Sequence, residues 1–274
     1  MLGKMLDNVR KISPLVHNIT NYVTINDCAN IVLACGASPI MANDEAEVEE
    51  ITAFCKGLNI NIGTLNRQTI PAMLKSCRKA NELKLPIILD PVGIGASELR
   101  KNTVNELINN IHFTVIRGNL SEIKTLALGY SPLRGVDADI TDDITADNLS
   151  AIMEFTKELA KKLNTIIAVS GTIDIVTDQN TTYGIYNGHP MMRSVTGAGC
   201  MLSALTAAYL AANPDTPLEA TAAAVCAIGI SGEKAYSRLS MEDGNATYRN
   251  YIIDAVYRLT DEALNEAARY KIFK

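Results

Sequence analysis

The sequence predicts an α/β fold with a mostly parallel central sheet, an antiparallel hairpin and helices on both faces. Two observations predict it: short apolar runs that end in Gly, Asp or Asn recur along the chain, and helical stretches separate them. Because these strands are apolar throughout, they are typical of a parallel sheet that is covered on both faces. The runs span residues 60–63, 86–90, 114–118 and 165–171.

Helical patterns fill the intervals between these strands. They cover residues 67–84, 98–110, 120–128 and 146–163. Pro71 stands in the first turn of the first helix, where a proline is tolerated because the backbone N–H that it lacks has no acceptor there. The predicted strands are therefore separated by crossover helices, as strands that pair in parallel require.

The pattern changes after residue 171. Residues 173–178 and 182–186 are predicted to be two strands joined by the turn-rich residues 179–181, which gives an antiparallel hairpin and hence a mixed sheet. From Gly197 onward the chain is expected to be almost wholly helical, and alanine-rich faces imply close helix packing. These helical runs cover residues 200–212, 218–235 and 245–270.

Composition bears on domain number and partners. The 274 residues carry a formal net charge of −5 and are 47% apolar, so a sizeable core is expected and a generic binder of polyanions is not. No linker composition, block of like charge or internal repeat divides the chain. We therefore expect a single domain over residues 1–274 and no nucleic-acid partner.

The cysteine pattern and the hydropathy bear on location. The six cysteines include no C-x-x-C pair and no histidine at zinc spacing, which favours a reducing compartment. The first residues lack the apolar core of a secretory signal, and no weakly polar stretch reaches the ~18 residues of a membrane span. We therefore expect a cytoplasmic protein without a membrane partner.

Acidic residues follow two of the predicted strands, at the edge where ligands bind to open parallel sheets. Asp90 ends one strand, and Glu122 comes shortly after the next. The two could share a magnesium ion, since this cation takes a few carboxylates together with waters and substrate phosphates. Taken singly, Asp90 is equally typical of a turn before Pro91, and Glu122 of a helix N-terminus. Their positions at neighbouring strand ends favour the metal.

Two glycines precede a long helix in the run TGAGCML, residues 196–202. Gly197 and Gly199 leave backbone N–H groups and the positive end of the helix dipole free to face an anion, and phosphate is the natural candidate. A G-x-G sequence before a helix is by itself equally typical of a plain N-terminal turn. The Walker and dinucleotide-binding patterns are both missing, so ATP would have to bind by another architecture.

A polar segment, residues 17–28, precedes an apolar helix and contains Asn21 and Asn26. Part of this segment must cap the helix, because Asn, Thr and Asp are the residues that close helix ends. His17 is more often a structural than a catalytic histidine. Met41 is by default a residue that fills a gap in the core.

Five strings along the chain resemble the hydroxyethylthiazole kinase family, in the same order and over nearly the whole length. They are VHNITNYV at 16–23, GASPIM at 36–41, LDPVG at 89–93, RGN with SE at 117–122, and VTGAGC at 195–200. The resemblance implies a ribokinase-like fold, a homotrimer, and transfer of the γ-phosphate of Mg-ATP to the alcohol of 4-methyl-5-(2-hydroxyethyl)thiazole in thiamine salvage.

The resemblance also implies positions that bind the thiazole. Met41 is similar to a residue of the thiazole pocket, and Gly197 to a second substrate contact. Asn21 and Asn26 belong to the segment that lines this pocket in relatives. All four are therefore expected to be substrate-binding residues.

A second set of positions is implied for the cofactors, which are ATP and Mg²⁺. Arg117 and Ser170 resemble the residues that contact the nucleotide. Asp90 and Glu122 resemble the acids linked to magnesium, which agrees with their positions at the strand ends.

The run Gly197, Ala198, Gly199, Cys200 resembles the catalytic run of the ribokinase-like enzymes. Most of these enzymes have a catalytic Asp where this chain has Cys200. A cysteine there is usual in the thiazole kinases, so the departure supports the narrower family. A weak base suffices at this position, because phosphoryl transfer passes through a loose transition state.

Three alternatives share these features. An ADP-dependent nicotinamide-nucleotide-hydrate dehydratase would keep the strand-end acids and the glycine-rich turn but would transfer no phosphate to its substrate. A non-catalytic nucleotide sensor would bind ATP and form no product. Within the kinases, a hydroxymethylpyrimidine or pyridoxal kinase is the nearest competitor, and assays with the three alcohols separate them.

Overall fold

The computed structural model describes residues 2–128 and 143–274. Its centre is a nine-stranded sheet in the order β2-β1-β3-β4-β5-β6-β7-β8-β9. The expected single domain, residues 1–274, includes residues 1 and 129–142, which lie outside the described part. The strands are β1 (Leu15–Ile19), β2 (Ser38–Ile40), β3 (Gly57–Asn61), β4 (Ile87–Asp90), β5 (Val115–Asn119), β6 (Ile166–Ser170), β7 (Asp174–Thr177), β8 (Thr182–Ile185) and β9 (Tyr270–Phe273).

The predicted mixed sheet is confirmed. The first six strands in this order, β2, β1, β3, β4, β5 and β6, pair in parallel. From β6 to β9 the neighbouring strands pair antiparallel. The predicted hairpin is β7 and β8, in register from Asp174–Ile185 to Thr177–Thr182. Because the first six strands in the order are parallel, their carboxyl ends all lie at one edge of the sheet.

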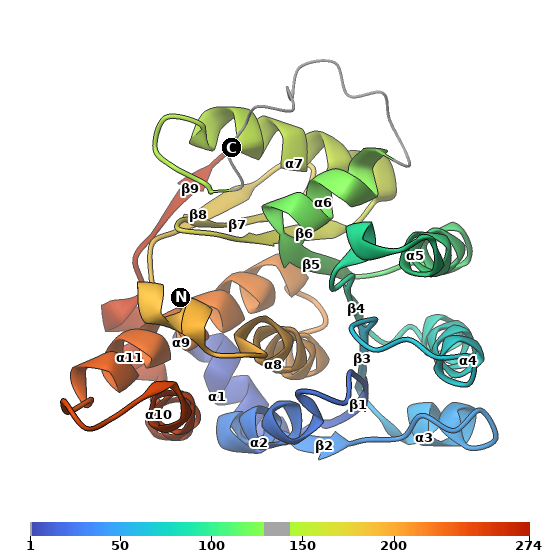
Figure 1. Ribbon diagram of the computed structural model, residues 1–274, viewed down its shortest axis with the longest axis horizontal. Coiled ribbons are helices and arrows are strands. Elements are labelled where there is room, and N and C mark those ends of the chain that lie inside the picture. Colours follow the sequence, from blue (N-terminus) through green and yellow to red (C-terminus); the bar gives the residue numbers. More distant parts are fainter. Residues whose placement is uncertain (1, 129–142) are drawn as a thin grey trace.

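Helices cover both faces of the sheet, as Figure 1 shows. One face packs against α1 (Gly3–Ile12), α2 (Ile25–Cys35), α8 (Ala198–Ala212) and α9 (Pro217–Ser237), with α10 (Asn245–Arg258) and α11 (Asp261–Ala267) beside them. The other face packs against α3 (Val48–Phe54), α4 (Thr69–Glu82), α5 (Glu98–Asn110), α6 (Leu120–Leu128) and α7 (Leu149–Leu163). Two short 3₁₀ helices are η1 (Ile94–Ala96) and η2 (Pro190–Ser194). No helix of the described residues is both long and apolar enough to cross a membrane.

The C-terminal part departs from the continuous helix predicted over residues 245–270. Helix α10 ends at Arg258, and α11 starts after Thr260, whose side chain accepts a hydrogen bond from the N–H of Ala263. The last residues then form β9, which pairs with β8 through Ile272 and Tyr183. A cap residue inside a helical pattern therefore starts a new helix and frees the tail for the sheet.

Helix α8 is the element that positions the site. It is buried from Cys200 to Ala212, and its small residues allow the sheet to approach closely. A Cβ added to Gly57, at the start of β3, would lie 3.1 Å from the Cβ of Ala211. At the other end of the same strand, Asn61 contacts Cys200. The helix therefore runs antiparallel to β3 and directs its N-terminus to the carboxyl edge of the sheet.

Candidate functional site

A buried carboxylate lies at the centre of this edge. Asp90, the last residue of β4, has no exposed surface. Its Oδ2 accepts hydrogen bonds from Asn61 Nδ2 at 2.9 Å and Ser203 Oγ at 2.7 Å, and lies 3.7 Å from Arg117 Nη1. Burial raises the pKa of Asp90 to about 6, while Arg117 lowers it and the nearby charge of Glu122 raises it. Asp90 Oδ1 has no hydrogen-bond partner within the described chain.

Arg117 joins this carboxylate to the next strand and to α8. Its Nη2 donates to Ser170 Oγ at 2.6 Å, and its side chain is 9% exposed. The guanidinium lies against Gly199, since a Cβ added there would be 2.6 Å from Nη1. A cation therefore sits beside the positive end of α8. The carboxylate of Asp90 offsets part of this positive charge, and a further anion would be stabilised there.

Gly197 and Thr24 bring a second segment to the same helix end. Gly197 is the N-cap of α8 with φ = 87°, a left-handed conformation that favours glycine. A Cβ there would collide with the Thr24 methyl group. Thr24 in turn donates through its N and Oγ1 to Asn21 Oδ1, both at 3.1 Å. The segment after β1 is thus packed onto the N-terminus of α8.

Cys200 lies inside a network of amides. Its Sγ accepts hydrogen bonds from Asn21 Nδ2 at 3.2 Å and Asn61 Nδ2 at 3.3 Å, and Asn21 Nδ2 also donates to Asn61 Oδ1 at 3.0 Å. Burial is the largest cause that raises the pKa of the Cys200 thiol, followed by the charge of Asp90, and the hydrogen bonds oppose them. Burial and the charge of Asp90 therefore outweigh these hydrogen bonds, and the thiol is protonated at neutral pH.

Glu122 occupies a helix-capping position. Its Oε2 accepts from the N–H of Asn119 at 2.8 Å while Asn119 Oδ1 accepts from the N–H of Glu122 at 2.8 Å, a reciprocal cap at the start of α6. Its Oε1 accepts from the N–H of Gly93 at 2.8 Å. The capping role that the sequence left open is therefore present, and the carboxylate still lies near enough to Asp90 to affect its pKa.

A cavity of about 570 Å³ opens beside Arg117. The predicted residues Arg117, Ser170, Ala198 and Gly199 line it, so strands β5 and β6 and the start of α8 meet there. Further lining residues come from the end of β5, α6, the segment from β6 to the start of β7, the segment after β8, α8 and α9, and they include Asn119, Ser121, Asp174, Asn187, Gly188, His189, Met192, Leu202, Ile228 and Gly229. Burial raises the pKa of Asp174 to about 7, and the N–H of Gly171 and the charge of Arg117 lower it.

Two of the residues predicted to bind the thiazole, Met41 and Asn26, lie outside the amide network. Met41 follows β2 and is half-buried, and the adjacent carbonyl of Ala42 accepts a hydrogen bond from His17 Nε2 at 2.8 Å. Asn26 is exposed on α2, where its carbonyl and side-chain oxygens accept from Asn30 at 2.9 and 3.0 Å. Within one chain, Asn26 therefore does not contact Asn21 or Cys200.

Three residues that hold the site together were not predicted from the sequence: Thr24, Asn61 and Ser203. Asn61 ends β3 as Asp90 ends β4, and this position at the same edge was the available signal. Ser203 lies three residues after Cys200, on neighbouring positions of one helix face. Thr24 had no signal beyond its place in the polar segment.

Comparisons with known proteins identify close relatives over the whole chain. A model of the hydroxyethylthiazole kinase family matches residues 6–262. The chain is 59% identical to a hydroxyethylthiazole kinase of Clostridium acetobutylicum over 273 residues, which is 100% of each chain. A hydroxyethylthiazole kinase of Methanobrevibacter smithii is 43% identical over 278 residues, 99% of this chain and 96% of the relative.

Solved structures agree with the fold. The structure of a hydroxyethylthiazole kinase protein from Pyrococcus horikoshii OT3 matches with a TM-score of 0.88 and 36% identity, over 100% of this chain and 99% of that one. A ribokinase-like superfamily protein from Enterococcus faecalis matches with a TM-score of 0.63 at 13% identity, over 93% and 89% of the two chains. The fold is therefore ribokinase-like, as predicted.

Because Arg117 lies against Gly199, we expect Gly199→Ala to lower the free energy of unfolding, whereas most glycine-to-alanine changes in helices raise it. Replacing a helical glycine by alanine ordinarily stabilises by about 0.5–1 kcal/mol. In Gly199→Ala we expect a loss of ~1 kcal/mol instead, because the new methyl group displaces Arg117 from Ser170. Urea unfolding measures it. Gly95→Ala, whose Cβ would meet Thr125 at an ordinary 3.5 Å, is the control. A Gly199→Ala protein more stable than its parent would contradict the packing.

Proposed function

The chain belongs to the hydroxyethylthiazole kinase family, ATP-dependent kinases of thiamine biosynthesis, and on this premise we propose how its site transfers the γ-phosphate of ATP to the thiazole alcohol. The cavity beside Arg117 takes the nucleotide. The amide network around Cys200 takes the alcohol. The N-terminus of α8 separates the two and receives the phosphate in transit.

One observation carries this proposal: Arg117 lies against Gly199, at the N-terminus of α8. The first N–H groups of a helix have no acceptor within it, and the helix dipole adds partial positive charge. A charge-assisted donor next to them completes a site for an anion. Phosphoryl transfer needs mainly this, positioning and stabilisation of the charge on the moving group.

The cavity has the size and lining of a nucleotide site. Its volume of about 570 Å³ lies within the ~300–1,000 Å³ usual for small-molecule pockets. Arg117 and Ser170 stand at the end next to α8, where we place the phosphates. Ile228 and Met192 provide apolar surface for the base. Ala198 and Gly199 present backbone rather than side chains to the phosphates.

On the acceptor side, Cys200, Asn21 and Gly197 lie together at the start of α8, and we assign them to the thiazole alcohol. Met41 leaves the same edge of the sheet after β2 and supplies apolar surface for the ring. Because burial and the charge of Asp90 raise the pKa of Cys200, most of its side chain is a protonated thiol at neutral pH and only the minor thiolate form can accept the proton of the alcohol. We therefore assign Cys200 an assisting role in proton removal, which a loose transition state permits.

We propose that Asp90 and Glu122 are the acids linked to Mg²⁺. The unpaired Oδ1 of buried Asp90 and the remaining lone pairs of Glu122 fit an ion that keeps its waters and binds mainly to phosphates. Residues 2–128 and 143–274 contain no group of three or more His, Cys, Asp or Glu placed to hold a metal, which agrees with a site completed by substrate. When bound, Mg²⁺ neutralises phosphate charge.

We propose a homotrimer whose subunit boundary lies near the thiazole pocket. Three apolar side chains beside the pocket are exposed in the single chain: Tyr22 by 57%, Val23 by 66% and Ile25 by 38%. A second subunit over this segment would bury them and would give the exposed Asn26 a partner near the site. Light scattering tests the assembly, and a fully active monomer would contradict it.

The six free, buried cysteines fit a single domain in a reducing cytoplasm, which we also propose.

A coupled assay of ADP formation tests the function. The protein is incubated with Mg-ATP and, in turn, the thiazole alcohol, hydroxymethylpyrimidine and pyridoxal. We expect one ADP for each thiazole phosphate formed, and much lower rates with the other alcohols. ADP formation only when a nicotinamide-nucleotide hydrate is added, with no phosphorylated alcohol, would favour a dehydratase. ATP binding without any product would favour a sensor.

For Cys200, we expect Cys200→Ala to lower kcat by about 10²-fold or less, because general-base assistance is worth ~10²–10⁴ and a loose transition state needs little of it. The affinities for ATP and the thiazole should hardly change. Cys200→Asp should remain active, since an acid stands there in most ribokinase-like enzymes. Steady-state kinetics measures both, and thermal melts check folding. An alanine variant as fast as the parent would remove the assisting role.

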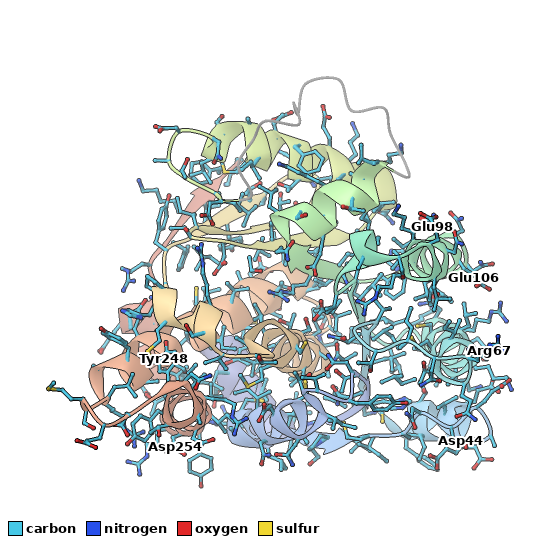
Figure 2. The ribbon with its side chains drawn as sticks, viewed as in Figure 1. Asp44, Arg67, Glu98, Glu106, Tyr248 and Asp254 are labelled. Carbon is cyan, nitrogen blue, oxygen red and sulfur yellow. The ribbon has the colours of Figure 1, made fainter. Side chains whose placement is uncertain are left out.

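The magnesium assignment predicts a shift in metal dependence. Asp90→Asn and Glu122→Gln each remove an anionic oxygen while keeping the size of the side chain, so both should raise the Mg²⁺ concentration for half-maximal rate. Rates are measured across a Mg²⁺ series at fixed ATP. Glu98→Gln on the outer side of α5, labelled in Figure 2, is a control that should leave the series unchanged. Parental Mg²⁺ dependence in both acid variants would rule out the assignment.

A further inference from the structure

Part of the nucleotide cavity is built from irregular backbone. The segment between β8 and α8 contributes Asn187, Gly188, His189, Pro190 and Met192 to its lining, and only η2 gives this segment regular structure. A wall of this kind needs support from outside, because irregular backbone has few hydrogen bonds of its own.

One carboxylate of α9 supplies much of that support. Glu233 Oε1 accepts from the N–H of Gly188 at 2.6 Å and from Arg269 Nη2 at 2.7 Å, and its Oε2 accepts from Arg269 Nη1 at 3.1 Å. The pair is bidentate, the geometry in which an ion pair gives most specificity. Burial alone would raise the pKa of Glu233, but the hydrogen bonds from Arg269 and Gly188 together outweigh it and lower the pKa.

Arg269 also fixes the segment through the tail of the chain. Its N–H donates to Asn187 Oδ1 at 2.7 Å and its Nη2 to the carbonyl of Tyr186 at 2.9 Å. Asn187 Nδ2 donates to the carbonyl of Ala267 at 3.0 Å. Arg269 directly precedes β9, which pairs with β8. We call Asn187, Glu233 and Arg269 the clamp, since they join α9, the cavity wall and the C-terminal strand.

Two glycines of α9 allow the cavity wall to pack closely against this helix. A Cβ added to Gly229 would lie 2.8 Å from the Cβ and 2.9 Å from the carbonyl carbon of Asn187. A Cβ on Gly232 would collide with Met192. The carbonyl of Gly232 accepts a hydrogen bond from Tyr248 on α10 at 3.0 Å, and Figure 2 labels this buried tyrosine. The helix that carries Glu233 is thus itself fixed from the side of α10.

We propose that Glu233 and Arg269 are positioning residues that hold the cavity wall, residues 187–193, in the conformation that binds ATP. Nucleotide affinity therefore depends on the C-terminal segment that contains Arg269 and β9. The proposal rests on the assignment of the cavity to ATP. Neither side chain is part of the cavity lining, so both act through Asn187 and Gly188.

The test compares Arg269→Met, Arg269→Lys and Glu233→Gln with the parent, in steady-state kinetics and in calorimetric titrations with ADP. We expect Arg269→Met and Glu233→Gln to raise the KM for ATP and the Kd for ADP about three- to tenfold, because charge-assisted hydrogen bonds are lost at a partly exposed pair. The kcat should stay within about twofold and the KM for the thiazole alcohol should not change. Arg269→Lys keeps the positive charge but cannot form the bidentate pair with Glu233. Its KM for ATP and its Kd for ADP should lie between those of the parent and Arg269→Met.

The control is Arg238→Met, which removes an exposed ion pair of 3.4 Å with Asp254 just after α9 and should leave ATP use unchanged. Arg269 is exposed, so its variants are expected to fold even where Glu233→Gln does not, and thermal melts check this. A parent that binds ADP but does not phosphorylate the alcohol would contradict the proposed function, while the ADP titrations would still test the clamp. Parental ADP affinity in Arg269→Met, or equal losses for both substrates, would overturn the inference.

Discussion

The buried carboxylate of Asp90 is the constraint on which the site depends. A charge without exposed surface is costly unless other groups hydrogen-bond to it. Here the partners come from three elements: Asn61 of β3, Ser203 of α8 and Arg117 of β5. Satisfying one acid therefore fixes α8 relative to two strands, and the same contacts place Arg117 at the end of that helix.

The glycines of the site follow from this arrangement. Gly199 has no side chain because Arg117 occupies that space, and Gly197 has none because Thr24 does. The glycines of the run that resembles the catalytic run of ribokinase-like enzymes are thus also required by packing. The backbone proposed to approach a phosphate is the same backbone that packs against Arg117 and Thr24. The proposed nucleotide cavity is therefore coupled to the amide network around Cys200.

Much of the fold could be predicted from sequence, because parallel strands and crossover helices leave local patterns of hydropathy. Asp90, Arg117 and Ser170 could be placed together for the same reason, since each stands at or near a strand end. The contacts of Ser203 and Glu233 depend on helices packing against distant strands, which no local pattern records. Strand β9 was missed because its partner β8 lies about 90 residues earlier, and Asn26 was grouped with Asn21 although α2 turns it outward.

The measurement that tests this account most directly is the binding of ADP and adenosine to the parent and to Arg117→Met by titration calorimetry. If Arg117 and the N-terminus of α8 form the phosphate site, the parent binds ADP much more tightly than adenosine. In the variant, the ratio of the affinities for ADP and adenosine should fall at least about tenfold, which corresponds to ~1.4 kcal/mol. The affinity for adenosine itself should stay the same. An unchanged preference for ADP in a folded Arg117→Met protein would contradict the account.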